Sequence, residues 1–240
     1  MFMENSSPKY KRVLLKLSGE ALAAGGKNIY DFDFIASVAE VLKKCRDHGV
    51  EIGVIVGAGN IWRGRQGGKM DRVRADSMGM LATAINALAL QDSFIQAGIP
   101  TEVMTAVPMN AFAEPYVPRN AVKSLEEGKV VIFGCGLGSP YFSTDTAAVL
   151  RAAEIGAEVI LMAKNIDGVY SADPKLDSTA VRYDELTYKE ILNKELKALD
   201  LTSAAFCMEN NIDAYAFGLN DPMNIYRVVM GEKIGTELHK

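Results

Sequence analysis

Residues 13–20 have the sequence Val13-Leu14-Leu15-Lys16-Leu17-Ser18-Gly19-Glu20. This short apolar run predicts a central strand covered on both faces, and the Ser-Gly pair predicts a turn after it. Lys16 interrupts the run, and a buried lysine is costly without an anionic partner, either an aspartate elsewhere in the chain or a ligand phosphate. The alternative is a strand-end lysine whose ammonium group reaches water. Gly19 lets the backbone come close to a ligand, and amides in such a turn can bind an anion.

Two further glycine turns follow predicted strands. Gly57-Ala58-Gly59-Asn60 follows a strand at 51–56, and residues 134–140 follow a strand at 129–133. Strands, glycine turns and helices in alternation are typical of an α/β domain with a parallel sheet, in which ligands bind at the carboxyl ends of the strands. We therefore expect the first two turns to share one site. Gly57-Ala58-Gly59 is not a GxGxxG motif and no GxxxxGK[ST] motif is present, so the two commonest nucleotide-binding motifs are excluded.

Apolar spacing predicts the remaining elements. The predicted helices are 34–45, 74–97, 119–127, 147–155, 184–198, 200–209 and 223–230, and the further strands are 101–104, 158–162, 213–217 and an edge strand at 235–236. We expect Asp33 to cap the first helix and Asp76 to lie in the first turn of the second.

Composition limits the function classes. The chain has 240 residues, of which 49% are hydrophobic and 23% charged, as is usual for a globular protein. Its net charge is −4 and it has no long basic block. This charge argues against nucleic acid as the main partner. No apolar stretch approaches the ~20 residues of a membrane span. Residues 1–11 lack the apolar core of a signal peptide, so we expect a cytoplasmic protein without a membrane partner. Residues 1–8 are expected to be loose, ahead of a single domain at 9–240.

Cysteine and histidine usage gives no metal site. Cys45, Cys135 and Cys207 are widely spaced, and the two histidines stand alone. Neither a zinc-ligand spacing nor a disulfide framework is present, so we expect buried, reduced thiols and name no protein metal ligand.

Several polar side chains near the turns are candidate ligand-binding groups. Arg63, just beyond the second turn, can bind a phosphate with two hydrogen bonds, or can be a solvated loop residue. Ser143 and Thr144 precede a helix whose N-terminus favours an anion. Asp145 is the best candidate for the carboxylate that pairs with Lys16, although it could simply begin the helix.

Two other sites have a structural and a functional interpretation. Asp76 is either a favourable charge at a helix N-terminus or an acceptor for ligand hydroxyl groups. In the loop at 163–174, Tyr170 and Asp173 either line a nucleoside pocket or serve only the turn, with Asp173 as its cap.

Together these blocks resemble the bacterial-type uridylate (UMP) kinases of the amino-acid-kinase superfamily, over about residues 9–238. The similar blocks are Lys16-Leu17-Ser18-Gly19-Glu20-Ala21-Leu22, Gly57-Ala58-Gly59-Asn60-Ile61-Trp62-Arg63-Gly64, Asp76-Ser77-Met78-Gly79-Met80-Leu81-Ala82-Thr83, Gly138-Ser139-Pro140-Tyr141-Phe142-Ser143-Thr144-Asp145, Asp167-Gly168-Val169-Tyr170-Ser171-Ala172-Asp173-Pro174, and the C-terminal stretches 186–188 and 228–236. The first glycine turn and the block at 167–174 fit several members of the superfamily, whereas the Asp76 block and the block that contains Ser143 narrow the resemblance to UMP kinases.

The resemblance implies a three-layer αβα sandwich with a central, mostly parallel sheet, and transfer of a phosphoryl group from ATP to UMP with Mg²⁺. It assigns catalytic roles to Lys16, Arg63 and Asp145. The implied ATP-binding residues are Lys16, Leu17, Ser18, Gly19, Gly59, Arg63, Lys164, Asn165, Tyr170 and Asp173. The implied UMP-binding residues are Gly57, Ala58, Asp76, Gly138, Ser139, Pro140, Tyr141, Phe142, Ser143 and Thr144. An acceptor portion at about 9–160 would precede an ATP-binding portion at about 161–240.

The chain departs from the family pattern at several positions. Ala58 stands in place of a glycine, Ser139 in place of asparagine or threonine, and residues 64–75 are about two shorter than in some relatives. The loop at 23–29 does not match the GTP-responsive segment of some members. The resemblance also implies a homohexamer with UTP and GTP as effectors. The alternatives are another superfamily kinase, acting on carbamate, acetylglutamate or a phosphomonoester, and a non-catalytic nucleotide-binding regulator.

Overall fold

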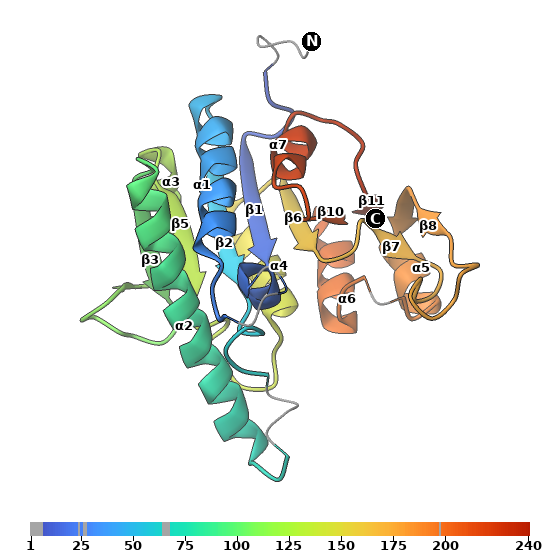
Figure 1. Cartoon of the computed structure of the whole chain (residues 1–240), viewed down its shortest axis with the longest axis horizontal. Coiled ribbons are helices and arrows are strands. Elements are labelled where there is room, and N and C mark those ends of the chain that lie inside the picture. Colours follow the sequence, from blue (N-terminus) through green and yellow to red (C-terminus); the bar gives the residue numbers. More distant parts are fainter. Residues whose placement is uncertain (1–6, 24, 26–27, 64–67, 197) are drawn as a thin grey trace.

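A nine-stranded sheet forms the middle layer of the computed structural model, which describes residues 7–23, 25, 28–63, 68–196 and 198–240 (Figure 1). Its strands run in the order β4 (Glu114–Pro115), β3 (Thr101–Thr105), β5 (Val130–Gly134), β2 (Glu51–Val56), β1 (Arg12–Leu17), β6 (Val159–Lys164), β10 (Asp213–Gly218), β11 (Thr236–His239) and β9 (Glu185–Thr187). Neighbouring strands are parallel except β10 and β11. The mostly parallel sheet confirms the predicted fold class.

The central strand β1 separates two hydrophobic cores because successive side chains of a strand point to opposite faces. Leu15 and Leu17 pack in the core under helices α1 (Phe32–Asp47), α2 (Arg72–Gln96) and α7 (Met223–Val229). Leu14 packs in the second core, under helices α3 (Pro118–Glu126), α4 (Thr144–Ile155), α5 (Tyr188–Asn193) and α6 (Leu201–Asn210). Helices therefore cover both faces, as the three-layer sandwich requires, and Lys16 shares the face of Leu14.

Aspartates set the first turns of two helices, at positions other than those predicted. Asp31, not Asp33, caps α1 by accepting a hydrogen bond from the amide of Phe34. Asp71 caps α2 by accepting from the amide of Arg74, so α2 begins at Arg72 and Asp76 lies in its second turn rather than its first.

The predicted helix at 184–198 was correct only for Tyr188–Asn193 (helix α5), and the described residues on either side of it are not helical. Residues 185–187 form strand β9, which pairs with β11, so β11 is not an edge strand. Helix α5 begins only after Thr187, because the Thr187 hydroxyl group accepts from the amide of Glu190 while the Glu190 carboxylate accepts from the amide of Thr187. A separate hairpin of β7 (Val169–Tyr170) and β8 (Arg182–Tyr183) was not predicted.

Helix α2 is the one helix among the described residues that is long and apolar enough to cross a membrane by length and composition. The expectation that no stretch approaches a membrane span was therefore too strict. This criterion is weak evidence, since core helices of globular domains also meet it, and α2 buries Ala87, Leu90 and Phe94 against the sheet.

Candidate functional site

The first two glycine turns lie in contact at the carboxyl ends of β1 and β2, as predicted. Gly19 begins the short 3₁₀ helix η1 (Gly19–Ala23). A Cβ atom at Gly19 would lie only 2.5 Å from the backbone nitrogen of Gly59 and 2.7 Å from the carbonyl oxygen of Gly57. Only glycine allows this close approach of two backbones. The amide of Gly57 also donates to the carbonyl of Leu17, which extends the β1–β2 pairing into the turns.

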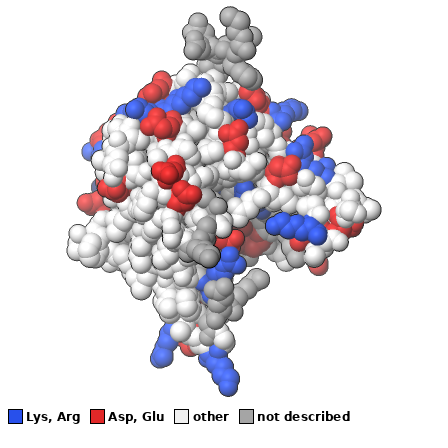
Figure 2. Space-filling view, in the orientation of Figure 1, with Lys and Arg blue, Asp and Glu red and all other residues white. Residues whose placement is uncertain are grey.

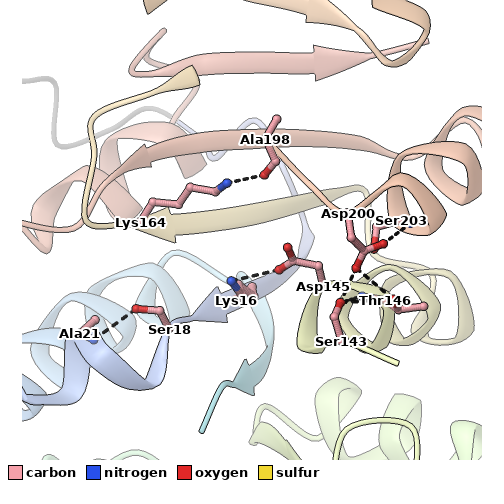
Figure 3. Close-up of polar contacts among 10 residues, drawn as sticks. All are labelled: Lys16, Ser18, Ala21, Ser143, Asp145, Thr146, Lys164, Ala198, Asp200 and Ser203. Atoms are coloured by element: carbon pink, nitrogen blue, oxygen red, sulfur yellow. Dashed lines mark hydrogen bonds and ion pairs between the residues drawn. The ribbon is translucent and has the colours of Figure 1, made fainter. Parts of the chain in front are cut away.

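Lys16 pairs with Asp145, which confirms the partner predicted for it. Its ammonium nitrogen lies 3.0 Å from a carboxylate oxygen of Asp145, in the first turn of α4 (Figure 3). The lysine and aspartate side chains are 14% and 22% exposed, so the cation is largely shielded but still reachable by a ligand. Ser143 caps α4 by accepting from the amide of Thr146, which begins the helix three residues earlier than the spacing predicted.

Lys164 adds a second cation beside this pair, at the end of β6. The pKa of Lys164 is lowered to about 8, mainly by burial; the charge of Asp145 opposes this shift and the charge of Lys16 adds to it. Its ammonium group donates to the carbonyl oxygen of Ala198 (Figure 3). Two lysines therefore stand near one aspartate, which leaves excess positive charge for an anionic ligand to neutralise.

Asp200 joins the site and was missed by sequence reasoning, which treated it only as the start of a helix. It caps α6 by accepting from the amide and hydroxyl group of Ser203, and its other oxygen accepts from the hydroxyl groups of Ser143 and Thr146 (Figure 3). Burial raises the pKa of Asp200, but these hydrogen bonds outweigh it and leave the pKa below its usual value. The aspartate itself could be predicted as an N-cap, because Asp is favoured at that position. Its contact with Ser143 could not be predicted from the sequence.

A cleft of about 570 Å³ gathers most of the residues predicted to bind UMP. Seven of them line it: Ala58, Asp76, Ser139, Tyr141, Phe142, Ser143 and Thr144. Gly57, Gly138 and Pro140 belong to the adjoining turns but do not line it. Asp76 accepts from the amide of Tyr141 at 2.8 Å and from Arg72 at 2.7 Å, so the carboxylate ties α2 to the third glycine turn. Trp62 also lines this cleft, and its indole donates to the carbonyl of Ala75.

A second cavity, of about 650 Å³, is lined by residues of the first two glycine turns and of the loops beside them. Of the predicted ATP-binding residues, Gly59, Arg63 and Asn165 line it, and the sequence analysis missed Glu20, Asn60 and Asn220, which also line it. Gly59 lines both hollows, so they meet at the second glycine turn.

Four of the other predicted ATP-binding residues sit around the first turn and its neighbouring strand. Leu17 is fully buried, and the Ser18 hydroxyl group accepts from the amide of Ala21 at 3.2 Å. Gly19 and Lys164 have been described above. All of them belong to the carboxyl ends of β1 and β6, beside Lys16.

Tyr170 and Asp173 do not line the second cavity. The Tyr170 hydroxyl group donates to Asp167, and a carboxylate oxygen of Asp173 accepts from the amide of Lys175 two residues on. The structure therefore shows Asp173 in the turn role that was its alternative interpretation.

Arg63 is held by Glu20 rather than free in solution. Their closest atoms are 2.5 Å apart, and the Arg63 Nε atom donates to the carbonyl of Gly59 at 3.3 Å. Both side chains are about half exposed. Gly64 and parts of the loops at 23–29 and 64–75, where the chain departs from the family pattern, lie outside the described residues.

Figure 2 shows how the charged side chains are distributed over one face of the described residues. On the face shown in Figure 2, Lys and Arg side chains are interspersed with Asp and Glu. Among the described residues no group of three or more His, Cys, Asp or Glu side chains is arranged to hold a metal ion. Cys45, Cys135 and Cys207 are buried and unpaired by disulfides, as predicted.

Comparison with known proteins identifies the family. The sequence model of the Amino acid kinase family matches residues 11–217. The chain belongs to the amino acid kinase family. A crystal structure of a UMP kinase from Bacillus anthracis matches with a TM-score of 0.92 and 37% identity, covering 96% of each chain.

Two further solved structures also match this chain. A UMP kinase from Ureaplasma parvum matches with a TM-score of 0.91 and 37% identity, covering 97% of this chain and 100% of that one. A uridylate kinase from Archaeoglobus fulgidus matches with a TM-score of 0.74 and 28% identity, covering 94% of this chain and 99% of that one. The similarity thus extends over nearly the whole chain.

Proposed function

We propose that this protein is a kinase that transfers the γ-phosphoryl group of ATP to UMP, giving ADP and UDP. The observation that carries the proposal is that two hollows meet at Gly59, with the Lys16–Asp145 pair beside the same turns. A two-substrate phosphoryl transfer needs such an arrangement, because the attacking and leaving oxygens must lie in line on either side of one phosphorus.

The chemistry requires positioning and positive charge more than proton transfer. A phosphate oxygen of UMP, already ionised at neutral pH, attacks the γ-phosphorus. The bond from that phosphorus to the β–γ bridging oxygen breaks, and ADP keeps the electron pair. No general base is needed. Lys16 would neutralise the transferring group, Asp145 would hold Lys16 in place, and Arg63 would leave Glu20 to bind phosphate.

The remaining predicted residues would divide between the two hollows. The 570 Å³ cleft would hold UMP, with Asp76 accepting from the ribose hydroxyl groups and Ser143 and Thr144 contacting the phosphate. The 650 Å³ cavity and the loop that carries Tyr170 and Asp173 would hold ATP, with Asn165 and Lys164 nearby. The proposed acceptor portion at about 9–160 would then also contribute Glu20, Asn60 and Arg63 to the ATP cavity, beside the ATP-binding portion at about 161–240.

Mg²⁺ would enter with ATP and be held mainly by phosphate oxygens and water, which is the usual manner for this ion at nucleotide sites. The donor set fits this arrangement. Asp145 is engaged by Lys16, and Asp200 by three hydroxyl groups, so neither carboxylate is free to form a preassembled protein cage.

Self-association would use the exposed face of α2. Met78, Leu81 and Ile85 are 39–52% exposed and lie at i, i+3 and i+7, on one side of the helix. Large apolar side chains gathered on one face mark an interaction surface. Two copies joined along α2 would be the building block of a homohexamer. UTP and GTP would act as effectors of a cytoplasmic enzyme of pyrimidine nucleotide synthesis.

The test is ADP release from ATP and Mg²⁺ with UMP, CMP, dUMP, carbamate or acetylglutamate offered separately. We expect release with UMP alone. Release with carbamate or acetylglutamate instead would keep the family and remove the acceptor roles of Asp76 and Ser143. If a folded protein binds ATP but releases no ADP with any of the five acceptors, the result would favour a non-catalytic regulator.

A further inference from the structure

The second glycine turn is attached to helix α2 through one buried amide side chain, Asn86. Asn86 is 0% exposed, and its Nδ2 atom donates to the carbonyl of Gly57 at 2.7 Å and to the Oδ1 atom of Asn60 at 2.8 Å. Its Oδ1 atom accepts from the Nδ2 atom of Asn60 at 3.0 Å. The two asparagines therefore form a reciprocal amide pair. A carbonyl oxygen can only accept, so Gly57 fixes which end of the Asn86 amide faces the turn.

The network also reaches the first glycine turn and the loop before α1. The Tyr30 hydroxyl group donates to the Oδ1 atom of Asn86 at 2.9 Å, and the Nδ2 atom of Asn60 donates to the carbonyl of Ile29 at 3.0 Å. A Cβ atom at Gly19 would lie 2.6 Å from the Oδ1 atom of Asn60, so the first turn packs directly on the pair. A fully satisfied buried amide of this kind fixes local geometry, because any rotation leaves a polar atom unpaired.

The bond to Gly57 sets the direction of the next amide. No cis peptide bond occurs among the described residues, and in a trans peptide the N–H group points opposite to the carbonyl group. Asn86 holds the Gly57 carbonyl toward α2, so the N–H group of Ala58 points away from α2. No hydrogen bond from the described part of the chain occupies the amides of Ala58 and Gly59, and both residues line the 570 Å³ cleft.

We propose that Asn86 is a positioning residue for phosphoryl transfer, which acts by fixing the Gly57–Ala58 peptide so that the amide of Ala58 can bind the phosphate. This inference rests on the proposed kinase function. Asn86 touches no substrate, so its effect passes through the Gly57–Ala58 peptide. Backbone donors held rigidly where charge develops stabilise a transition state, and loss of one such donor costs on the order of 10²-fold in turnover.

The main variant is Asn86→Leu, which keeps the approximate volume and removes every hydrogen bond of the amide. With UMP we expect kcat to fall on the order of 10²-fold, while the KM values for ATP and UMP stay within about threefold, because an interaction made only in the transition state lowers kcat and kcat/KM together. The matched control is Tyr30→Phe, which removes one bond to Asn86 but leaves its bond to Gly57, and should keep kcat within about threefold. A folded Asn86→Leu protein with near-normal kcat would overturn the proposal.

A second variant, Asn86→Asp, keeps the shape and serves even where Asn86→Leu does not fold. An ionised carboxylate cannot donate to the Gly57 carbonyl, whereas a protonated one can. The kcat of Asn86→Asp relative to wild type should therefore rise as the pH falls from 8 to 6, with circular dichroism showing a folded protein throughout. A constant ratio would contradict the proposal. Wild-type protein without UMP-dependent ADP release would instead overturn the kinase function itself.

Discussion

The ammonium group of Lys16 lies 3.0 Å from the carboxylate of Asp145, across the interface between the central strand and helix α4. The alternation of β1 explains the contact, because Leu14 already packs among the residues of α4 and Lys16 follows on the same face. Removing one member of a shielded ion pair leaves the other charge uncompensated. The pair is therefore the place where a single substitution should affect turnover most.

Replacing Asp145 with asparagine should lower kcat for ATP and UMP by on the order of 10²-fold or more, because Lys16 loses the charge that holds it in place. Lys16→Ala should do the same. Steady-state ADP release measures both. Asp33→Asn is the matched control, since Asp33 is also in the first turn of a helix but is exposed on α1. Near-normal turnover in either site variant would remove that residue from the catalytic group.

Lys164 should make stability depend on pH in an alkaline window. Its pKa is lowered to about 8 in the folded chain, against 10.5 for an ordinary lysine. Between these values the unfolded chain holds a proton that the folded chain has released, so the free energy of unfolding should rise with pH. Lys164→Met should remove this rise. It should also add about 2 kcal/mol at pH 7, namely about 3 from the relieved burial of charge minus about 1 for the lost bond to Ala198.

Urea unfolding at pH 7, 8, 9 and 10 measures this dependence. Lys194 is exposed, so Lys194→Met is the control, and it should leave the dependence of the unfolding free energy on pH unchanged. A wild-type stability that falls steadily from pH 8 to 10 would contradict the assignment of Lys164 as a buried, easily deprotonated group.

Asp76→Ala should raise the KM for UMP by about tenfold or more and change the KM for ATP little, since a hydrogen bond to a charged group contributes about 1.5–3 kcal/mol. The variant also releases the Tyr141 amide, which should loosen the third glycine turn. Substrate-saturation curves for each nucleotide measure the effect. Asp92→Ala, on the exposed side of the same helix, is the control. An effect confined to ATP would move Asp76 to the other hollow.

Gly19→Ala should lose most activity, because its Cβ atom would meet backbone atoms of Gly57 and Gly59 at 2.5–2.7 Å and must push the two turns apart. Gly128→Ala tests whether any glycine substitution has this effect. Gly128 has a φ of +76° and lies outside the site, so its replacement should cost about 1 kcal/mol of stability and leave kcat unchanged. Measuring both kcat and the melting temperature of each variant separates a loss of activity from a loss of stability. Equal kcat losses in both variants would contradict the contact argument.

Local sequence patterns were sufficient to predict much of this fold and part of the candidate site. The apolar run around Leu14 and Leu17, and the glycines at 19, 57 and 59, predict a buried strand and turns at the edge where the structure places them. The partner of Lys16 could be predicted as well, because a buried lysine needs a carboxylate and Asp145 begins the helix after a third glycine turn.

Long-range contacts could not be predicted in the same way. Asp200 has the sequence signal of a helix cap, and only the packing of α6 beside α4 brings it to Ser143. The strand at 185–187 has no strong β pattern of its own and forms because β11 offers it a partner. The Asp33 error has a similar cause, since two aspartates flank Phe32 and it is Asp31 whose amide is fixed, by a hydrogen bond to the carbonyl of Leu22.

The carboxylate of Asp200 accepts hydrogen bonds from Ser143 and Thr146 while it caps α6. A ligand that draws the Ser143 hydroxyl group toward its own phosphate therefore competes with a helix end that belongs to the other half of the chain. Thermodynamic reciprocity follows: whatever steadies the start of α6 makes Ser143 harder to recruit, and whatever recruits Ser143 loosens α6. Through Asp200, recruitment of the Ser143 hydroxyl group by a ligand and the stability of the first turn of α6 would therefore depend on each other.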